Sequence, residues 1–134
     1  MAKIRRIPLA WTTLFTNIDS VNGTFIPMTP WMSASDVAKA RCTWESSGET
    51  VANMVTRPGY QVADVENSVS STNTLGSDTQ TGNAVKYASA PTDISSVTQS
   101  KQLVRWGLWV KNPAGTTTVQ CVRGGGVMEV EDST

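Results

Sequence analysis

Residues 101–123 read KQLVRWGLWVKNPAGTTTVQCVR, and this stretch decides the predicted fold. In its first half Val104, Trp106, Leu108 and Val110 occur at alternate positions. Successive side chains of a β-strand point to opposite faces, so these four residues share one face, which we expect to be buried. The residues of the other face are Leu103, Arg105, Gly107, Trp109 and Lys111. We expect that second face to meet solvent or a partner.

The second half of the stretch predicts a hairpin. Residues 112–115 read NPAG, in which Pro113 fixes φ at one corner and Gly115 accepts a positive φ. A symmetric loop would set Leu108 opposite Val119 and Trp106 opposite Cys121, so that both strands turn one apolar face inward.

Composition limits the function classes. The chain has 134 residues, 11 basic and 11 acidic side chains, a net charge of +0 and no histidine. Its length predicts one domain over residues 1–134, with a core large enough to need no metal. A neutral chain lacks the electrostatic footprint of a nucleic-acid binder, and no apolar run approaches the ~20 residues of a membrane span. The apolar part of the chain's start is too short for a signal peptide, so we expect this start to belong to the mature protein and the protein to be made in the cytoplasm.

Alternation and turn signals predict further strands. Strands are expected over residues 4–17, 33–44, 60–65, 84–88, 94–99 and 127–131. For residues 33–44 a short capped helix is the alternative, but Ala38, Ala40, Cys42 and Trp44 alternate more cleanly than any helical stripe. Asn22-Gly23 and Ser47-Gly48 predict hairpins, and Pro58-Gly59 predicts a type II turn that completes a three-stranded meander. Pro27 and Pro30 confine residues 25–31 to a sheet edge or an irregular crossing.

Many short strands separated by turns indicate an all-β fold, an antiparallel β-sandwich of jelly-roll type. Residues 66–83 are polar and without periodicity, and they predict a long loop that is a candidate contact arm. The run Gly124–Gly126 lacks the strand, lysine and helix context of a phosphate loop and predicts a bulge or bend in the last strand.

The sequence offers no catalytic constellation, no metal site and no cofactor site. Without histidine, the commonest general base and metal ligand is absent. Cys42 and Cys121 are expected to be buried thiols, although a disulfide between them stays an alternative. Asp64 and Glu66 could bind Ca²⁺ or act as a carboxylate pair, but solvated acids at a strand end are the simpler interpretation.

The two ends of the chain carry opposite charges. Lys3, Arg5 and Arg6 form a basic cluster, and Glu129, Glu131 and Asp132 form an acidic end. Either both ends are simply solvated, or they meet between subunits or on a larger assembly. The predicted partner-binding residues are Lys3, Arg5, Arg6, Arg105, Trp109, Lys111, Glu129 and Glu131.

In composition and layout the chain resembles the capsid decoration, or cement, proteins of tailed bacteriophages. The resemblance rests on VRWGLWVKN with its turn, on VQCVRGG, on the basic amino-terminal arm and on the polar loop. It implies a non-enzymatic virion protein that binds and stabilises the outer surface of a capsid lattice, with a major capsid protein or other virion protein as partner and often as a homo-oligomer. Such a role needs only about 800 Å² per contact, because repeated contacts multiply a modest affinity.

A carbohydrate-binding or lectin-like module is the alternative interpretation. In that case Trp109, with Tyr60 or Tyr87, would serve as a stacking platform for sugar rings. A glycan panel monitored by tryptophan fluorescence distinguishes it from the assembly hypothesis.

Overall fold

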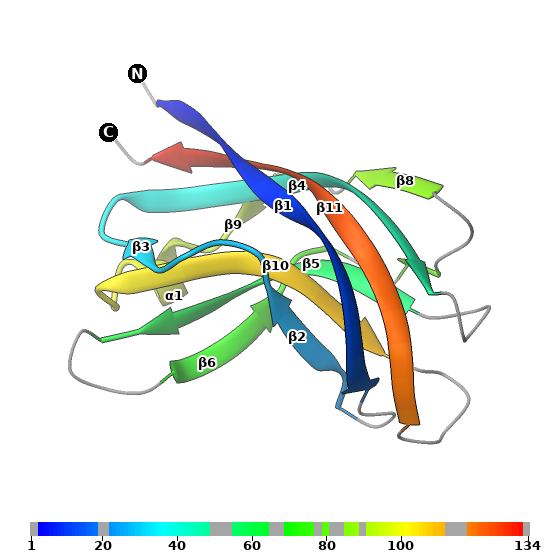
Figure 1. The fold of residues 1–134 in the computed structure, drawn as a ribbon. Coiled ribbons are helices and arrows are strands. Elements are labelled where there is room, and N and C mark those ends of the chain that lie inside the picture. The colour runs from blue at the N-terminus through cyan, green and yellow to red at the C-terminus, as the bar shows by residue number, and fades with distance from the viewer. Residues whose placement is uncertain are drawn as a thin grey trace.

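The computed structural model shows two antiparallel sheets that pack face to face (Figure 1). It describes residues 3–18, 22–48, 55–64, 69–76, 79–80, 85–88, 91–111 and 118–132. No helix in these ranges is long and apolar enough to cross a membrane.

The first sheet, sheet A, has five strands. Its order is β1 (Ile4–Ile18), β11 (Thr118–Asp132), β4 (Val37–Gly48) and β8 (Val85–Ala88), with β9 (Thr92–Asp93) also paired to β4. The long strands β1 and β11 are neighbours along nearly their whole length, so the two ends of the described chain lie side by side.

The second sheet, sheet B, has six strands. Its order is β2 (Thr24–Pro27), β10 (Leu103–Lys111), β5 (Val55–Ala63) and β6 (Val69–Thr74), with β3 (Met32–Ser33) paired to β10 and β7 (Thr79–Gln80) paired to β5. A one-turn helix, α1 (Ser95–Thr98), follows β9.

The strand order is that of a jelly roll. The antiparallel pairs β1·β11, β2·β10, β4·β8 and β5·β6 nest inside one another along the chain, and two of the four pairs belong to each sheet. Two Greek keys of four strands each give this arrangement. The predicted fold class, an antiparallel jelly-roll sandwich, is therefore confirmed.

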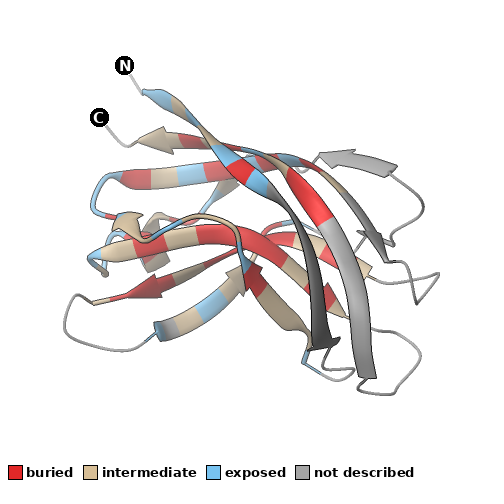
Figure 2. Ribbon diagram, in the orientation of Figure 1, coloured by how far each residue is buried: buried red, intermediate tan, exposed pale blue. Residues whose placement is uncertain are grey.

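The core lies between the sheets, where the predicted face of β10 meets β4 and β11 (Figure 2). The fully buried side chains of β10 are those predicted, namely Val104, Trp106, Leu108 and Val110. Facing them from sheet A are Ala40, Cys42, Trp44, Met128 and Val130. Burial of one face of each strand is what the two-residue period dictates.

The hairpin predicted between β10 and β11 is wrong. β10 pairs with β2, β3 and β5, whereas β11 pairs with β1 and β4 in the opposite sheet. The expected ladder partners of Leu108 and Trp106 are therefore replaced: Leu108 lies between Ile26 and Pro58, and Trp106 lies opposite Tyr60. Two strands whose apolar faces meet across a core show the same alternation as two strands of one hairpin, so the pattern could not separate them.

Two further hairpins are wrong for the same reason. Gly23 has the positive φ expected at a turn, 74°, but the strands on its two sides belong to different sheets. Ser47 and Gly48 lie within β4, opposite Arg123 and Val122 of β11, rather than in a turn. Consecutive strands in a jelly roll mostly alternate between the sheets, so a local reversal does not make them neighbours.

The turn predicted at Pro58-Gly59 is also wrong, because both residues lie inside β5, and the meander fails with it. The Pro58 carbonyl accepts a hydrogen bond from the Leu75 N–H at 2.8 Å. In an antiparallel strand the N–H and C=O groups of one residue point to the same neighbouring strand. The Pro58 nitrogen therefore points, like its carbonyl, to the gap between β6 and β7, where neither strand pairs with it. A proline is tolerated there because no ladder donor is needed.

Strand β4 confirms the strand interpretation over the helix for residues 37–44, whereas residues 35–36 of the predicted range form a turn. Ala40, Cys42 and Trp44 are buried, while Lys39, Arg41 and Thr43 are exposed. Cys42 is a buried thiol and forms no disulfide. Its β11 neighbour is Met128, seven residues away from Cys121, which excludes a bridge between the two cysteines.

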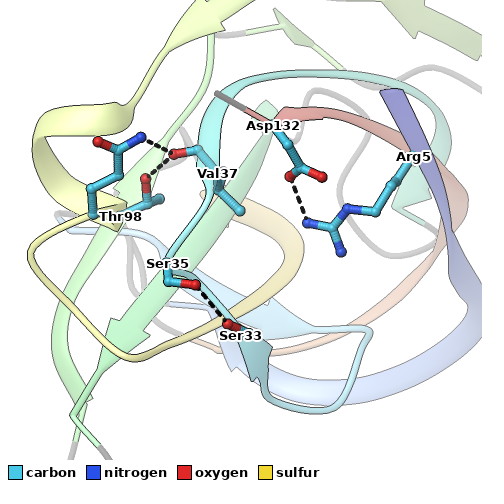
Figure 3. A network of polar contacts seen from close by, with 7 residues as sticks. Arg5, Ser33, Ser35, Val37, Thr98 and Asp132 are labelled. Atoms are coloured by element: carbon cyan, nitrogen blue, oxygen red, sulfur yellow. Dashed lines mark hydrogen bonds and ion pairs between the residues drawn. The ribbon is translucent and has the colours of Figure 1, made fainter. Parts of the chain in front are cut away.

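The long loop predicted over residues 66–83 is wrong in part, because it contains β6 and β7 at one edge of sheet B. The polar Ser, Thr and Asn side chains of β6 give no alternation of apolar and polar residues in the sequence, because one face of β6 meets solvent. The strand predicted over residues 84–88 is confirmed as β8, whereas residues 94–99 form α1 instead of a strand. Thr98 anchors this helix through a 2.7 Å hydrogen bond from its hydroxyl to the Val37 carbonyl (Figure 3).

The predicted sheet edge is confirmed, whereas the glycine run differs from its prediction. β2, which ends at Pro27, is an edge strand of sheet B. The glycine run lies inside β11, and β1 has one extra residue opposite it, between Leu9 and Thr12. The bulge therefore lies in β1, whereas β11 continues through the glycine run in unbroken pairing with β4, so the bulge predicted in the last strand is wrong.

Candidate functional site

The outer face of sheet A carries a ladder of opposite charges, here called the charged face. Glu129 of β11 lies between Arg6 of β1 and Arg41 of β4 in the strand register. Its carboxylate accepts a hydrogen bond from Arg41 Nε at 2.7 Å and lies 3.5 Å from Arg6 Nε. The Arg41 bond, followed by the charges of both arginines, lowers the pKa of Glu129 below its ordinary value.

The chain ends are joined by a second ion pair at the rim of the sandwich. Arg5 Nη2 lies 3.0 Å from Asp132 Oδ1 (Figure 3), and the Asp132 N–H donates to the Lys3 carbonyl at 2.8 Å. Of the basic and acidic ends, Arg5 and Asp132 therefore meet within one molecule, which neither the solvated nor the intersubunit alternative predicted. This pair is only partly exposed, whereas fully exposed ion pairs add little stability, about 0–1 kcal/mol each.

The charged face also exposes apolar side chains. Ile4 is 57% exposed and Val127 is 40% exposed. A shallow depression of about 250 Å³ lies beside Ile4, between Arg41, Glu129 and Pro91. The predicted residue Glu131 and Lys39 complete its lining. Partner binding by Lys3, Arg5, Arg6, Glu129 and Glu131 stays a prediction.

The outer face of sheet B is different, and we call it the aromatic–arginine face. Its members are Phe25, Trp31, Arg57, Arg105, Trp109 and Lys111, all of them partly exposed. The three predicted residues of β10 lie here, on the face opposite the core, as the alternation requires. Phe25, Trp31 and Arg57 were missed, because which strands flank β10 is a property of topology that no local pattern shows.

One row of side chains crosses the aromatic–arginine face. The guanidinium carbon of Arg105 lies 4.5 Å from the centre of the Trp31 ring, a cation–π distance. Arg105 Nε donates to Gln61 Oε1 at 2.8 Å, and Gln61 Nε2 donates to Thr72 Oγ1 at 3.0 Å. The row therefore holds Arg105 in one orientation, with contacts on both sides of its side chain.

A second aromatic group surrounds Trp109. Its indole N–H donates to the Asn22 carbonyl at 3.0 Å, and the Arg57 guanidinium lies 6.0 Å from its ring centre. A Cβ at Gly23 would collide with the Trp109 ring, so the turn between the sheets packs directly on this side chain. Trp109 is therefore partly covered by the connection at residues 22–23.

Glycines make room for Phe25 between these two groups. A Cβ at Gly107 would lie 3.0 Å from the Phe25 ring and would collide with the Ile26 carbonyl, while one at Gly59 would lie 3.3 Å from the same ring. Gly107 and Gly59 face each other in the β10·β5 ladder. The ring consequently lies across two adjacent strands, and it continues the aromatic surface between Trp31 and Trp109.

The glycan platform of the alternative interpretation is not assembled among the described side chains. Tyr60 is buried, with its ring centre 5.7 Å from that of Trp106, and burial raises the pKa of Tyr60 to about 12. The side chain of Tyr87 lies outside the described set. Tyr60 is thus a core residue, and its proposed role beside Trp109 is wrong.

The carboxylate candidates do not gather either. Asp64 lies 3.5 Å from Lys101 Nζ, and Glu66 lies outside the described residues. In the ranges that the structure covers, no three acidic, cysteine or histidine residues form a group able to hold a metal ion.

By class, the chain has the fold of a jelly-roll β-sandwich. Among solved structures it is similar to a subviral particle of infectious bursal disease virus VP2, with a TM-score of 0.64 and 12% identity over 97% of this chain and 33% of that one. It is similar to T=1 particles derived from the same virus at a TM-score of 0.64 and 10% identity, covering 97% of this chain and 31% of that one. It is also similar to the T13 particle of that virus, with a TM-score of 0.62 and 10% identity over 97% of this chain and 31% of that one.

These similarities show that the chain shares its fold with a domain-sized part of proteins from infectious bursal disease virus particles. The chain spans about a third of the length of the proteins it matches. No protein-family model and no curated protein sequence matches the chain.

Proposed function

We propose that this protein is a non-enzymatic structural component of a virus particle. The observation that carries the proposal is the jelly-roll strand order, which matches particle-forming viral proteins over 97% of the chain. The absence of histidine from the sequence and the pairing of Asp64 and Glu129 with basic side chains favour a binding role over catalysis.

We further propose that the protein acts as a decoration protein, adding to the outside of a shell that another protein builds. Its two outer faces differ in chemistry, one with charges paired in the plane of the sheet and one with aromatic and arginine side chains. A protein that sits on a lattice needs one face for the lattice and one for solvent, and unlike faces provide that distinction. Repeated copies convert a modest affinity per contact into stable attachment.

The test is the protein content of virus particles from cells that carry this gene. Particles are treated with nuclease and protease, banded by density and analysed by quantitative mass spectrometry. A virion component is recovered in a fixed ratio to the major shell protein. Absence from banded particles would refute the structural role.

Stripping separates the decoration role from a shell-building role. Mild washing in salt or denaturant should release a decoration protein and leave closed shells visible by electron microscopy. If the shells disassemble whenever this chain is removed, the chain builds the lattice and the decoration role is wrong. Light scattering behind a sizing column, at low and high salt, measures whether the purified protein forms a homo-oligomer.

A further inference from the structure

We propose that the aromatic–arginine face docks an acidic segment of a partner protein. The proposal deepens the function given above by naming the chemistry of the partner, and it rests on that function only for where the partner is found. Its argument uses the charges, contacts and register of sheet B alone.

The first step is the distribution of charge. The strands of sheet B read TFIP, MS, VTRPGYQVA, VSSTNT, TQ and LVRWGLWVK, and they contain Arg57, Arg105 and Lys111 but no acidic residue. On the charged face, by contrast, Glu129 is paired with two arginines. A chain of zero net charge thus presents a sheet whose charged side chains are all positive. Such a face attracts carboxylates and repels a second positive surface.

The second step is the presentation of Arg105. Its guanidinium stacks on Trp31 at 4.5 Å, and Gln61 holds its Nε–H at 2.8 Å. An arginine has five N–H donors in a planar fork, so the terminal amino groups supply the donors for a carboxylate. Because the stack and the Gln61 bond already restrict the side chain, less rotamer entropy is lost when a partner binds.

The third step is spacing. In the register, Arg105 is level with Gln61, and Arg57 is level with Trp109, four residues farther along β10. At ~3.3 Å per residue and ~4.8 Å between strands, the two arginines are about 14 Å apart, with Lys111 roughly 7 Å beyond Trp109. An extended segment that follows β10 and carries acidic residues at intervals of about four and two positions would meet all three cations, with Arg57 using the donors that its bond to the Gly76 carbonyl leaves over.

The fourth step is the apolar surface between the cations. Phe25, Trp31 and Trp109 are all partly exposed on this face. Aromatic residues and arginine are enriched at protein interfaces, where they supply most of the binding energy. A partner segment with apolar residues between its carboxylates would cover these rings while its acids meet the arginines.

The experiment measures binding of a fluorescent poly-glutamate peptide of about ten residues, long enough to cover the roughly 20 Å between the outermost cations. Fluorescence anisotropy is recorded with the native protein and with Arg105→Gln, Arg105→Lys and Arg57→Gln. Arg41→Gln on the charged face is the matched control, because it removes the same charge from the opposite sheet. Circular dichroism and melting temperature establish that each variant is folded.

We expect Arg105→Gln and Arg57→Gln each to weaken peptide binding about two- to fivefold at low salt, and Arg41→Gln to leave it unchanged. Arg105→Lys should also weaken it, since an ammonium cannot reproduce the planar fork. Raising the ionic strength from about 0.01 M to about 0.15 M should reduce affinity in the native protein.

Three results would overturn the inference. These are no binding at low salt, equal losses in the Arg105 and Arg41 variants, and tighter binding of an oligo-dT of matched length that depends on Arg105. The last result would assign the face to single-stranded nucleic acid. None of them bears on whether the chain is present in virus particles, so failure here is distinct from failure of the proposed function.

Discussion

Trp106 offers the sharpest test of the core. Its side chain is 0% exposed and packs on Tyr60, and its indole N–H has no hydrogen-bond partner within the described part of the chain. Truncation to alanine removes the largest buried ring and should cost about 3–5 kcal/mol. Phenylalanine keeps most of the packing and also removes a buried donor whose desolvation costs about 1–3 kcal/mol. The free energy of unfolding of the Trp106→Phe variant should therefore lie within about 1 kcal/mol of that of the native protein.

Urea unfolding followed by circular dichroism measures both values. With an m-value of about 2 kcal/mol per molar, Trp106→Ala should lower the midpoint by about 2 M and Trp106→Phe by less than about 0.5 M. If Trp106→Phe lowers the free energy of unfolding as much as Trp106→Ala does, the indole N–H forms a hydrogen bond that stabilises the fold. If alanine costs less than about 1 kcal/mol, the ring is not central to the core.

Three further outcomes follow from single contacts. Because Arg41 lowers the pKa of Glu129, the stability from this pair is present above the unfolded-state value near 4.3 and is lost as pH falls through the folded value. Melting curves of Glu129→Gln should thus differ from the native protein at neutral pH and converge with it under acid conditions; a constant gap would contradict the pairing. Thr98→Val should cost about 1–2 kcal/mol by leaving the Val37 carbonyl short of a donor, whereas Thr98→Ser should keep most of it, as chemical unfolding can show. Burial raises the pKa of Cys42 to about 12, so alkylation at pH 8, mapped by mass spectrometry, should reach this thiol only after unfolding; rapid labelling of the native protein would place it at the surface.

The sequence predicts faces well and neighbours poorly. In β10 the two-residue period identifies the buried side chains, and in β4 it separates strand from helix, because burial acts on each strand locally. The hairpins fail because a turn signal reports only that the chain reverses, as at Gly23. Whether the next strand pairs beside the last or crosses to the other sheet is decided by the whole set of strands.

The same limit applies to the candidate site. Arg105, Trp109 and Lys111 were found because alternation places them opposite the core. Trp31 could not be assigned to Arg105, since it lies outside the strands and approaches β10 only through the order of sheet B. Pro58 shows the reverse case: its turn signal is strong, yet its pairing with Leu108 on one side and the hydrogen bond from the Leu75 N–H on the other keep it within a strand.

The total charge of the chain and the charge of each sheet lead to different expectations about binding partners. A total of +0 argues against any strongly charged partner when the charges are taken as evenly spread. The jelly roll places β5 and β10 side by side in one sheet, which gathers Arg57, Arg105 and Lys111, while β11 brings Glu129 to the other. A partner meets one face at a time and is screened from charges beyond about 8–10 Å at physiological salt. The charge that matters for docking is therefore that of the sheet, and for sheet B it is positive.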